Sequence, residues 1–358
     1  MRVLPAPLSI VPRARRDGSS WPKPSGSSSP CRRPSDSIPA RQTPDVGRRD
    51  PVEPALNGVL VLDKPRGPTS HDIVALVRRL SGVRRVGHGG TLDPFAAGVL
   101  PVFLGRATRM VEYHLADEKA YRALVVFGAR STTDDLDGEL TPTDVPAPDR
   151  DALERALEPL RGWIEQVPPD HSAVRVAGRH AYDLARHGQK PELKPRRVEI
   201  RALDLVTWDD SDPSRPAATL MVRCSAGTYV RAIARDLGER LGSGAYLSAL
   251  TRTASGPFRI EDAHALDAAR EVLAAGRVAE LLLPPDVGLE AYPRLELSAE
   301  DLSTLARGQA VRHRGTSELS SGPSGLLRVV DGEGRLAAMA RYDSGRLHPE
   351  KVFMTPGN

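Results

Sequence analysis

Hydrophobic patterning begins abruptly near residue 58 and continues over most of the chain that follows. Residues 1 to about 55 are dense in Pro, Ser and Arg and show neither helical nor strand periodicity. A segment of this composition buries too little apolar surface to offset the entropy lost on ordering. We therefore predict a disordered leader over residues 1–55 and a folded part that begins at residue 56.

The composition of the leader fits three origins. It is rich in Arg and Ser and poor in acids near its start, as organellar transit peptides are. A misassigned start upstream of the true one, or a basic tail that binds RNA, fits the same composition. The sequence leaves these three interpretations open.

Beyond the leader, short apolar strands alternate with amphipathic helices. One helix is expected to begin at Ser70, a good N-cap, and a second one spans Thr228 to Leu241. The predicted strands are 58–63, 99–104, 121–127, 198–206 and 218–224, and a further helix is expected within 149–162. This alternation predicts one domain of mixed α/β (α+β) class over residues 56–285.

The pattern of predicted elements changes from Tyr292 onward. A short helix at 299–307 is followed by two strand-like segments, 326–331 and 336–342, which Asp331-Gly332 separates from each other. We predict a small, mostly β domain over residues 290–358.

Charge and cysteine content limit the classes of function. The net charge is +4, and all but six of the 50 basic residues are Arg. Arg binds phosphate bidentately and stacks on bases, which favours RNA contacts, although a GC-rich genome explains the bias equally well. Cys31 and Cys224 are too few for a disulfide framework, and no apolar run could span a bilayer, so we expect a cytoplasmic protein.

The segment from Gly87 to Pro94 carries the strongest local signal. Its glycines permit close approach to a ligand, and Pro94 favours an extended conformation that presents the Asp93 carboxylate outward. A plain turn is the simpler interpretation of the spacing alone. The Gly-Lys-Ser/Thr ending of a phosphate-binding P-loop is absent, which argues against nucleotide hydrolysis.

Metal sites find no support in the sequence. None of the nine histidines has cysteine or carboxylate neighbours at a recognised metal-ligand spacing. Asp134, Asp135 and Asp137 resemble part of a calcium loop, but the bidentate Glu that closes such a loop is missing. We interpret this acidic cluster as a solvated turn.

Several segments in a fixed order resemble the TruB family of tRNA pseudouridine synthases. The resemblance covers roughly residues 57–260, and the small C-terminal part resembles, more weakly, the PUA-like domain of that family. The segments that carry it are 58–65, 86–94, 97–101, 119–121, 166–169 with 172–173, 181–188, 224–231 and 250–252. The family fold has a mixed, largely antiparallel sheet, so we expect the same here.

The resemblance implies an isomerase that needs no cofactor. Uridine is detached at its N-glycosidic bond, rotated and reattached through carbon, in this family at position 55 in the T-loop of tRNAs. Asp93 matches the essential carboxylate, and Arg231 matches the arginine that pairs with it and favours its ionised form. Tyr121 matches a tyrosine that stacks on the target base and handles a proton.

Three further positions match residues that contact the substrate. Tyr229 and Leu250 correspond to residues lining the uridine pocket, and His88 to a histidine beside the flipped nucleotide. Without the resemblance, Tyr121 and Leu250 would be interpreted as core residues and Arg231 as a surface cation. The expected partner is the T-arm of tRNA, bound by a monomer without metal or membrane; Arg78, Arg79, Arg84 and Arg85 are candidates for phosphate contacts.

The chain departs from the family pattern in four places. His171 stands where a tyrosine is usual, and Arg175 where Lys is common. The 55-residue leader is foreign to the family, and a Ser/Gly/Pro stretch interrupts the C-terminal part near 317–324. Two rivals remain: an RNA-binding protein without catalysis, and a guide-RNA-dependent rRNA pseudouridine synthase. The first has no need of Asp93, Tyr121 and Arg231 together, and the absence of a Lys-rich tail disfavours the second.

Overall fold

The structure is a computed structural model that describes residues 56–176, 178–313 and 322–354. The predicted leader over residues 1–55, and most of the Ser/Gly/Pro stretch near 317–324, lie outside the described residues. Within them, the chain forms a ten-stranded sheet, a five-stranded sheet and two small two-stranded sheets. No described helix has the length and apolarity required to cross a membrane.

The ten-stranded sheet is mixed and largely antiparallel, as predicted. Its strands follow the order β14-β1-β3-β12-β4-β11-β10-β7, with β13 paired to β12 and β2 paired to β3. Only the β1–β14 and β3–β12 pairs of this sheet are parallel. The strands are β1 (Gly58–Lys64), β2 (Val86–His88), β3 (Ala97–Leu104), β4 (Lys119–Phe127), β7 (Gly162–Gln166), β10 (Arg196–Asp209), β11 (Ala217–Cys224), β12 (Ala245–Ser255), β13 (Phe258–Arg259) and β14 (His264–Ala265).

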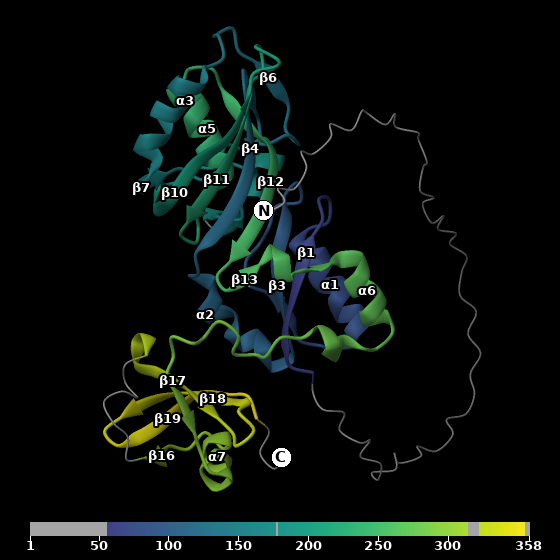
Figure 1. Cartoon of the computed structure of the whole chain (residues 1–358), viewed down its shortest axis with the longest axis vertical. Coiled ribbons are helices and arrows are strands. Elements are labelled where there is room, and N and C mark those ends of the chain that lie inside the picture. Colours follow the sequence, from purple (N-terminus) through teal and green to yellow (C-terminus); the bar gives the residue numbers. More distant parts are fainter. Residues whose placement is uncertain (1–55, 177, 314–321, 355–358) are drawn as a thin grey trace, which may run out of the picture. The chain divides into compact units, whose positions relative to one another are not determined.

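Helices cover two regions of this sheet (Figure 1). Helices α1 (Ser70–Ser81) and α6 (Leu266–Ala274) pack beside β1, and their apolar faces join Leu60 and Leu62 in one core cluster. Helices α3 (Arg150–Leu157) and α5 (Val230–Arg240) cover β4, β10 and β11 around a second cluster. Two of the predicted site residues, Tyr121 and Leu250, belong to or pack against this second cluster, on the neighbouring strands β4 and β12.

Two short helices and two hairpins complete the part before residue 260. The helices are α2 (Val111–Leu115) and α4 (Ala181–Arg186). Strands β5 (Ala129–Ser131) and β6 (Leu140–Pro142) form one hairpin, and β8 (Arg175–Val176) and β9 (Arg179–His180) form the other. The β5–β6 hairpin carries the acidic cluster of residues 134–137.

The N-terminus of α1 corrects one prediction. Thr69, not Ser70, is the N-cap: its side chain accepts a hydrogen bond from the Asp72 amide, and the Asp72 carboxylate accepts one from the Thr69 amide. Ser70 is fully buried, and its hydroxyl bonds to the backbone of Leu92. Thr69 therefore caps the helix while Ser70 holds the segment that carries Asp93.

Most of the other predicted elements are confirmed with small shifts at their ends. The helix predicted from Thr228 begins at Val230, and the segment 149–162 contains α3, a 3₁₀ turn and the start of β7. Strand β12 was not predicted, although it pairs with β3, β4 and β13. Its sequence mixes Ser, Thr, Arg and Ala and lacks a continuous apolar run, so its strand character depends on its neighbours.

The C-terminal residues form the predicted small β structure. A five-stranded sheet has the strand order β15 (Arg294–Glu296), β17 (Leu326–Val330), β18 (Leu336–Asp343), β19 (Arg346–Val352) and β16 (Val311–Arg312). Helix α7 (Ala299–Ala306) packs Leu302 and Leu305 against its apolar residues. This sheet curls around its own core cluster.

Candidate active site

A cavity of about 290 Å³ opens where β4, β12 and the start of α5 meet the segment that carries Asp93. Five of the six predicted site residues line it: Asp93, Tyr121, Tyr229, Arg231 and Leu250. His88 is not among the lining residues; it lies immediately before Gly89, which is. The volume is at the small end of ligand pockets and suits a single nucleotide base.

The segment that presents Asp93 is held by backbone hydrogen bonds at both ends. The Gly89 amide donates to the carbonyl of Pro101 at 2.9 Å, and the Gly67 amide donates to the carbonyl of Pro94 at 2.8 Å. Gly89 itself leaves little room for a side chain, because a Cβ atom would lie 3.0 Å from the Phe103 ring. The glycine-rich sequence thus serves close packing on β3 as well as access to the cavity.

Lys64 supports the same segment from the end of β1. Its fully buried side chain donates to the carbonyls of Pro65 and Pro68, each at 2.9 Å, and to that of Pro94 at 3.5 Å. Burial lowers its pKa to about 8, and the nearby Asp93 carboxylate opposes the shift. Lys64 therefore places a positive charge behind the candidate catalytic carboxylate.

Arg231 is buried beside Asp93, not exposed at the helix start. Its guanidinium is only 4% exposed and pairs with Asp93 at 3.0 Å and with Asp135 at 3.3 Å. It also donates to the backbone carbonyls of Thr133 at 3.0 Å and His171 at 2.9 Å. Four oxygen partners hold it in one orientation, while its buried Nε finds no partner.

The acidic cluster corrects a second prediction. Asp135 is buried, and its carboxylate accepts hydrogen bonds from the Thr133 hydroxyl at 2.6 Å and the Asp137 amide at 3.1 Å in addition to pairing with Arg231. Only Asp137 fits the predicted solvated turn, since Asp134 is also largely covered. The sequence pattern of closely spaced aspartates gives no sign that α5 supplies arginines to neutralise them.

Arg252 is a site residue that the sequence reasoning missed. It is 1% exposed, and it donates to the carbonyls of Val99 at 2.8 Å, Gly90 at 3.1 Å and Thr91 at 3.3 Å. It also lies opposite Tyr121 in the register of β12 and β4. Arg252 thus ties β3 to the Asp93 segment beside Tyr121, and the one signal for it was its place in the motif at 250–252.

The two tyrosines of the cavity are neutral phenols. Burial raises the pKa of Tyr121, and the Arg252 guanidinium opposes this rise. Burial also raises the pKa of Tyr229, and the charges of Arg196 and Arg231 oppose this rise. The Gln166 side chain holds the Tyr229 backbone through both its amide nitrogen and its oxygen, at 3.1 and 2.8 Å. The backbone that carries the Tyr229 ring is therefore held by a residue outside the cavity lining.

His88 lies at the edge of the site. Its Nδ1 accepts a hydrogen bond from the Gly90 amide at 3.3 Å, and its ring meets that of His71 edge to face at 5.5 Å. Burial lowers its pKa, and the charges of His71 and Arg252 lower it further. A neutral imidazole is therefore favoured at this position at neutral pH.

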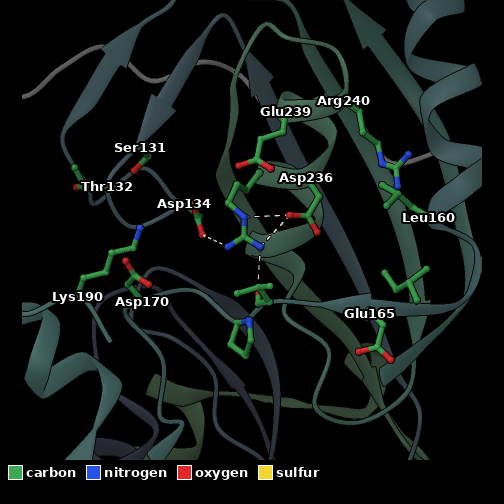
Figure 2. A pocket seen from close by; sticks show the side chains of 14 residues that line it. Ser131, Thr132, Asp134, Leu160, Glu165, Asp170, Lys190, Asp236, Glu239 and Arg240 are labelled. Atoms are coloured by element: carbon green, nitrogen blue, oxygen red, sulfur yellow. Dashed lines mark hydrogen bonds and ion pairs between the residues drawn. The ribbon is translucent and has the colours of Figure 1, made fainter. Parts of the chain in front are cut away.

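A second and larger cavity, of about 920 Å³, is lined by residues within 235–240 of α5, among other residues (Figure 2). None of the predicted site residues lines it; its wall is formed largely by charged side chains, among them Asp134, Asp170 and Arg235. Among the described residues, no group of three His, Cys, Asp or Glu side chains is arranged to hold a metal ion.

Comparison with known proteins identifies the family of the chain. Residues 78–230 match the model of the TruB family pseudouridylate synthase N-terminal domain, and residues 231–290 match that of the tRNA pseudouridylate synthase B C-terminal domain. Two relatives, from Bradyrhizobium diazoefficiens and Thermobifida fusca, are named tRNA pseudouridine synthase B. They are 41% and 42% identical, over 84% and 83% of this chain and 87% and 98% of their own.

The fold has solved counterparts as well. An H/ACA RNP structure bound to a substrate RNA containing 2′-deoxyuridine includes a chain that superposes with a TM-score of 0.60. The two chains are 24% identical, and the match covers 84% of this chain and 86% of that one, which supports the pseudouridine synthase fold. The family models and the relatives at about 40% identity together show that the chain belongs to the TruB family of pseudouridine synthases.

Proposed function

We propose that this enzyme isomerises uridine to pseudouridine in the T-loop of tRNA, at position 55, with Asp93 as the catalytic residue. The observation that carries the proposal is the Asp93–Arg231 pair, in which a 38% exposed carboxylate faces the cavity and a buried arginine holds it at 3.0 Å. A carboxylate held in this way can act on a bound nucleotide without losing its orientation.

The reaction rearranges bonds within one nucleotide. The N1–C1′ bond breaks, the base rotates, and a C5–C1′ bond forms; the proton on C5 leaves and N1 gains one. No electrons are exchanged with another molecule, which agrees with the expectation of an enzyme without a cofactor. Asp93 acts beside the ribose and base during glycosidic bond breaking, and Arg231 keeps its carboxylate oriented.

Tyr121 and its neighbours serve the base. The Tyr121 ring stacks on the rotating uracil, and its hydroxyl handles the proton at C5. Tyr229 and Leu250 form the walls that hold the base after it leaves the tRNA stack, and His88 contacts the neighbouring nucleotide. Flipping the base costs a few kcal/mol, which these stacking and pocket contacts offset.

The remaining assignments extend the proposal to the whole chain. Residues 56–285 form the catalytic domain, and residues 290–358 form a PUA-like domain that supports tRNA binding. The enzyme acts as a monomer in the cytoplasm, and exposed arginines such as Arg84 and Arg85 contact phosphates. Measuring the mass in solution, with and without tRNA, tests the monomeric state.

One experiment tests the function directly. The purified protein is incubated with an unmodified tRNA transcript and no guide RNA, and pseudouridine is mapped by carbodiimide-dependent primer extension. We expect a single stop at the T-loop uridine, which disappears with Asp93→Asn and with a transcript carrying cytidine there. Absence of pseudouridine with the wild-type protein would refute the proposal.

A further inference from the structure

A second arginine of α5 lies one helical turn after Arg231 and has partners of the same kinds. Arg235 Nη1 pairs with Asp134 Oδ2 at 3.2 Å, and Arg235 Nη2 donates to the carbonyl of Val167 at 2.8 Å (Figure 2). The pair is only partly covered, since the side chains of Arg235 and Asp134 are 23% and 16% exposed. It lines the larger cavity and does not reach Asp93.

The two arginines form two parallel clips. We call the pair of Arg235 with Asp134 the outer clip, and that of Arg231 with Asp135 the inner clip. Each arginine also donates to a backbone carbonyl in the segment 167–171. Two adjacent aspartates thus meet two arginines one turn apart, and both arginines hold the same segment.

The backbone at Asp134 makes this arrangement possible. In an extended chain, adjacent side chains point in opposite directions, so only one of two neighbouring aspartates would face α5. Asp134 adopts a left-handed conformation with φ of 61°, which turns both carboxylates toward the helix. Its carbonyl accepts a hydrogen bond from the Leu247 amide at 3.0 Å, which fixes the turn to β12.

Helix α5 provides a rigid base for both clips. It lies so close to the start of β12 that a Cβ atom on Gly238 would be 2.1 Å from the Ala245 nitrogen. The helix therefore cannot move toward β12, and the arginines act from a fixed position. Movement at the outer clip must occur on the side of the segment 167–171.

That segment continues into one wall of the candidate active site. Gln166, just before it, bonds to the backbone of Tyr229, whose side chain lines the small cavity. Ala173, just after it, lines the small cavity itself. The position of residues 167–173 therefore contributes to the shape of the cavity that receives the nucleotide.

We propose that the outer clip of Arg235 and Asp134 positions the segment 167–173 as a wall of the nucleotide pocket and thereby strengthens tRNA binding. The proposal rests on the proposed function, because it concerns how the same site receives its substrate. Arg235 and Asp134 are positioning residues that do not touch the reacting atoms. Removing the clip leaves the segment with fewer anchors, so part of the binding energy is lost in ordering it.

Steady-state kinetics with an unmodified tRNA transcript test the proposal. Asp134→Asn and Arg235→Met should each raise the KM for tRNA about 3- to 10-fold, the scale of one partly buried ion pair and one hydrogen bond. The value of kcat should stay within about twofold, because Asp93 and Arg231 are unchanged. The KM of the double variant should not exceed that of the more impaired single variant, since the two residues act as one unit.

Asp236→Asn is the matched control. Asp236 also pairs with Arg235, at 2.9 Å, but it belongs to α5 and does not link the helix to another segment. Its substitution should leave the KM for tRNA within about twofold of the wild-type value. A rise equal to that of Asp134→Asn would show that the charge of the cavity, and not the clip, determines binding.

Hydrogen exchange provides a second readout that does not depend on activity. The backbone amides of residues 167–173 should exchange faster in Asp134→Asn than in the wild-type protein, while those of α5 stay unchanged. Unchanged KM and unchanged exchange in the isosteric Asp134→Asn variant, or a loss in kcat alone, would overturn the proposal. Absence of wild-type pseudouridine formation would instead refute the proposed function.

Discussion

Helix α5 carries two arginines, Arg231 and Arg235, one turn apart. Both pair with carboxylates, but their side chains differ in how deeply they are buried. Arg231 is 4% exposed and pairs with two carboxylates, one of them Asp93; Arg235 is 23% exposed and pairs with Asp134 and Asp236. Removing one partner of a buried ion pair costs about 3–5 kcal/mol, whereas an exposed pair contributes about 0–1 kcal/mol. The same side-chain chemistry can therefore serve catalysis at one turn and binding at the next.

Asp93, the carboxylate that Arg231 holds in the small cavity, should show the largest effect. Asp93→Asn keeps the shape of the side chain but removes the charge that acts on the nucleotide. We expect the single-turnover rate to fall by at least about 10⁴-fold, the scale for groups that act on reacting atoms. The affinity for tRNA should change little, since it is spread over many phosphate and stacking contacts.

Gel-shift titration and single-turnover assays on the same preparation separate these two quantities. Any turnover in Asp93→Asn above a small residue would contradict the assignment of Asp93. An Asp236→Asn variant removes a carboxylate that does not line the small cavity, and it should keep the wild-type rate.

Arg231 should show the next largest effect. Arg231→Ala leaves Asp135 buried without its cation, so we expect a rate loss of about 10²- to 10⁴-fold with a smaller change in tRNA affinity. Arg231→Lys restores the charge but not the planar fork that reaches Asp93, Asp135 and two carbonyls, so it should rescue the rate only in part.

Thermal melting distinguishes loss of catalysis from loss of fold in these variants. Rates are compared at a temperature at which each variant is fully folded. Full rescue of the rate by Lys would show that charge alone matters at position 231 and that orientation does not.

Removing only the hydroxyl of Tyr121 should reduce the catalytic rate less than removing the Arg231 side chain does. Tyr121→Phe keeps the ring that stacks on the base but removes the group that Arg252 contacts, so tRNA should bind nearly normally and turnover should fall about 10²-fold. Tyr121→Leu should lose both binding and turnover. Single-turnover rates measured at saturating tRNA decide between these outcomes, and a wild-type rate in the Phe variant would leave Tyr121 a role in stacking only.

The sequence predicted the residues of the small cavity far better than it predicted the outer clip. Apolar spacing located α1 and α5, and the family motifs brought Asp93, Tyr121, Tyr229, Arg231 and Leu250 to one cavity. These motifs are local, so each can be recognised without knowing the fold. Their roles in the reaction remain predictions, whereas the family and the fold class are confirmed.

The outer clip and the support of the inner site depend on distant contacts. Asp134 and Arg235 are 101 residues apart, and Arg252 reaches carbonyls 153 to 162 residues away. Side chains whose partners are backbone carbonyls leave no complementary residue in the sequence to be recognised. The prediction that the acidic cluster is a solvated turn was wrong. Burial depends on how the sheet and the helix assemble, and the local sequence does not show this.

The smallest predicted effect concerns the pH dependence of the outer clip. Burial raises the pKa of Asp134 from 3.8 to about 6, and the charges of Arg235 and Arg231 oppose the shift while those of Asp236 and Asp170 add to it. Between pH 4 and 6 the folded protein holds a proton that the unfolded chain has released. The contribution of Asp134 to the free energy of unfolding therefore falls as pH rises through this window.

Asp134→Asn has no such proton and tests both consequences. Relative to the wild-type protein, the variant should gain stability between pH 4 and 7, by at most about 3 kcal/mol in urea unfolding.

The binding defect of Asp134→Asn should change in the same window, because the wild-type Arg235–Asp134 pair is ionised at pH 7.5 and largely neutral at pH 5. We expect the ratio of KM for tRNA, variant over wild type, to fall from about 3- to 10-fold at pH 7.5 toward about 1 at pH 5. The pKa of Asp236 is raised by burial as well, so Asp236→Asn provides the control: its KM ratio should stay flat across this range. A ratio for Asp134→Asn that is equally flat would show that the charge of Asp134 has no part in holding the segment 167–173.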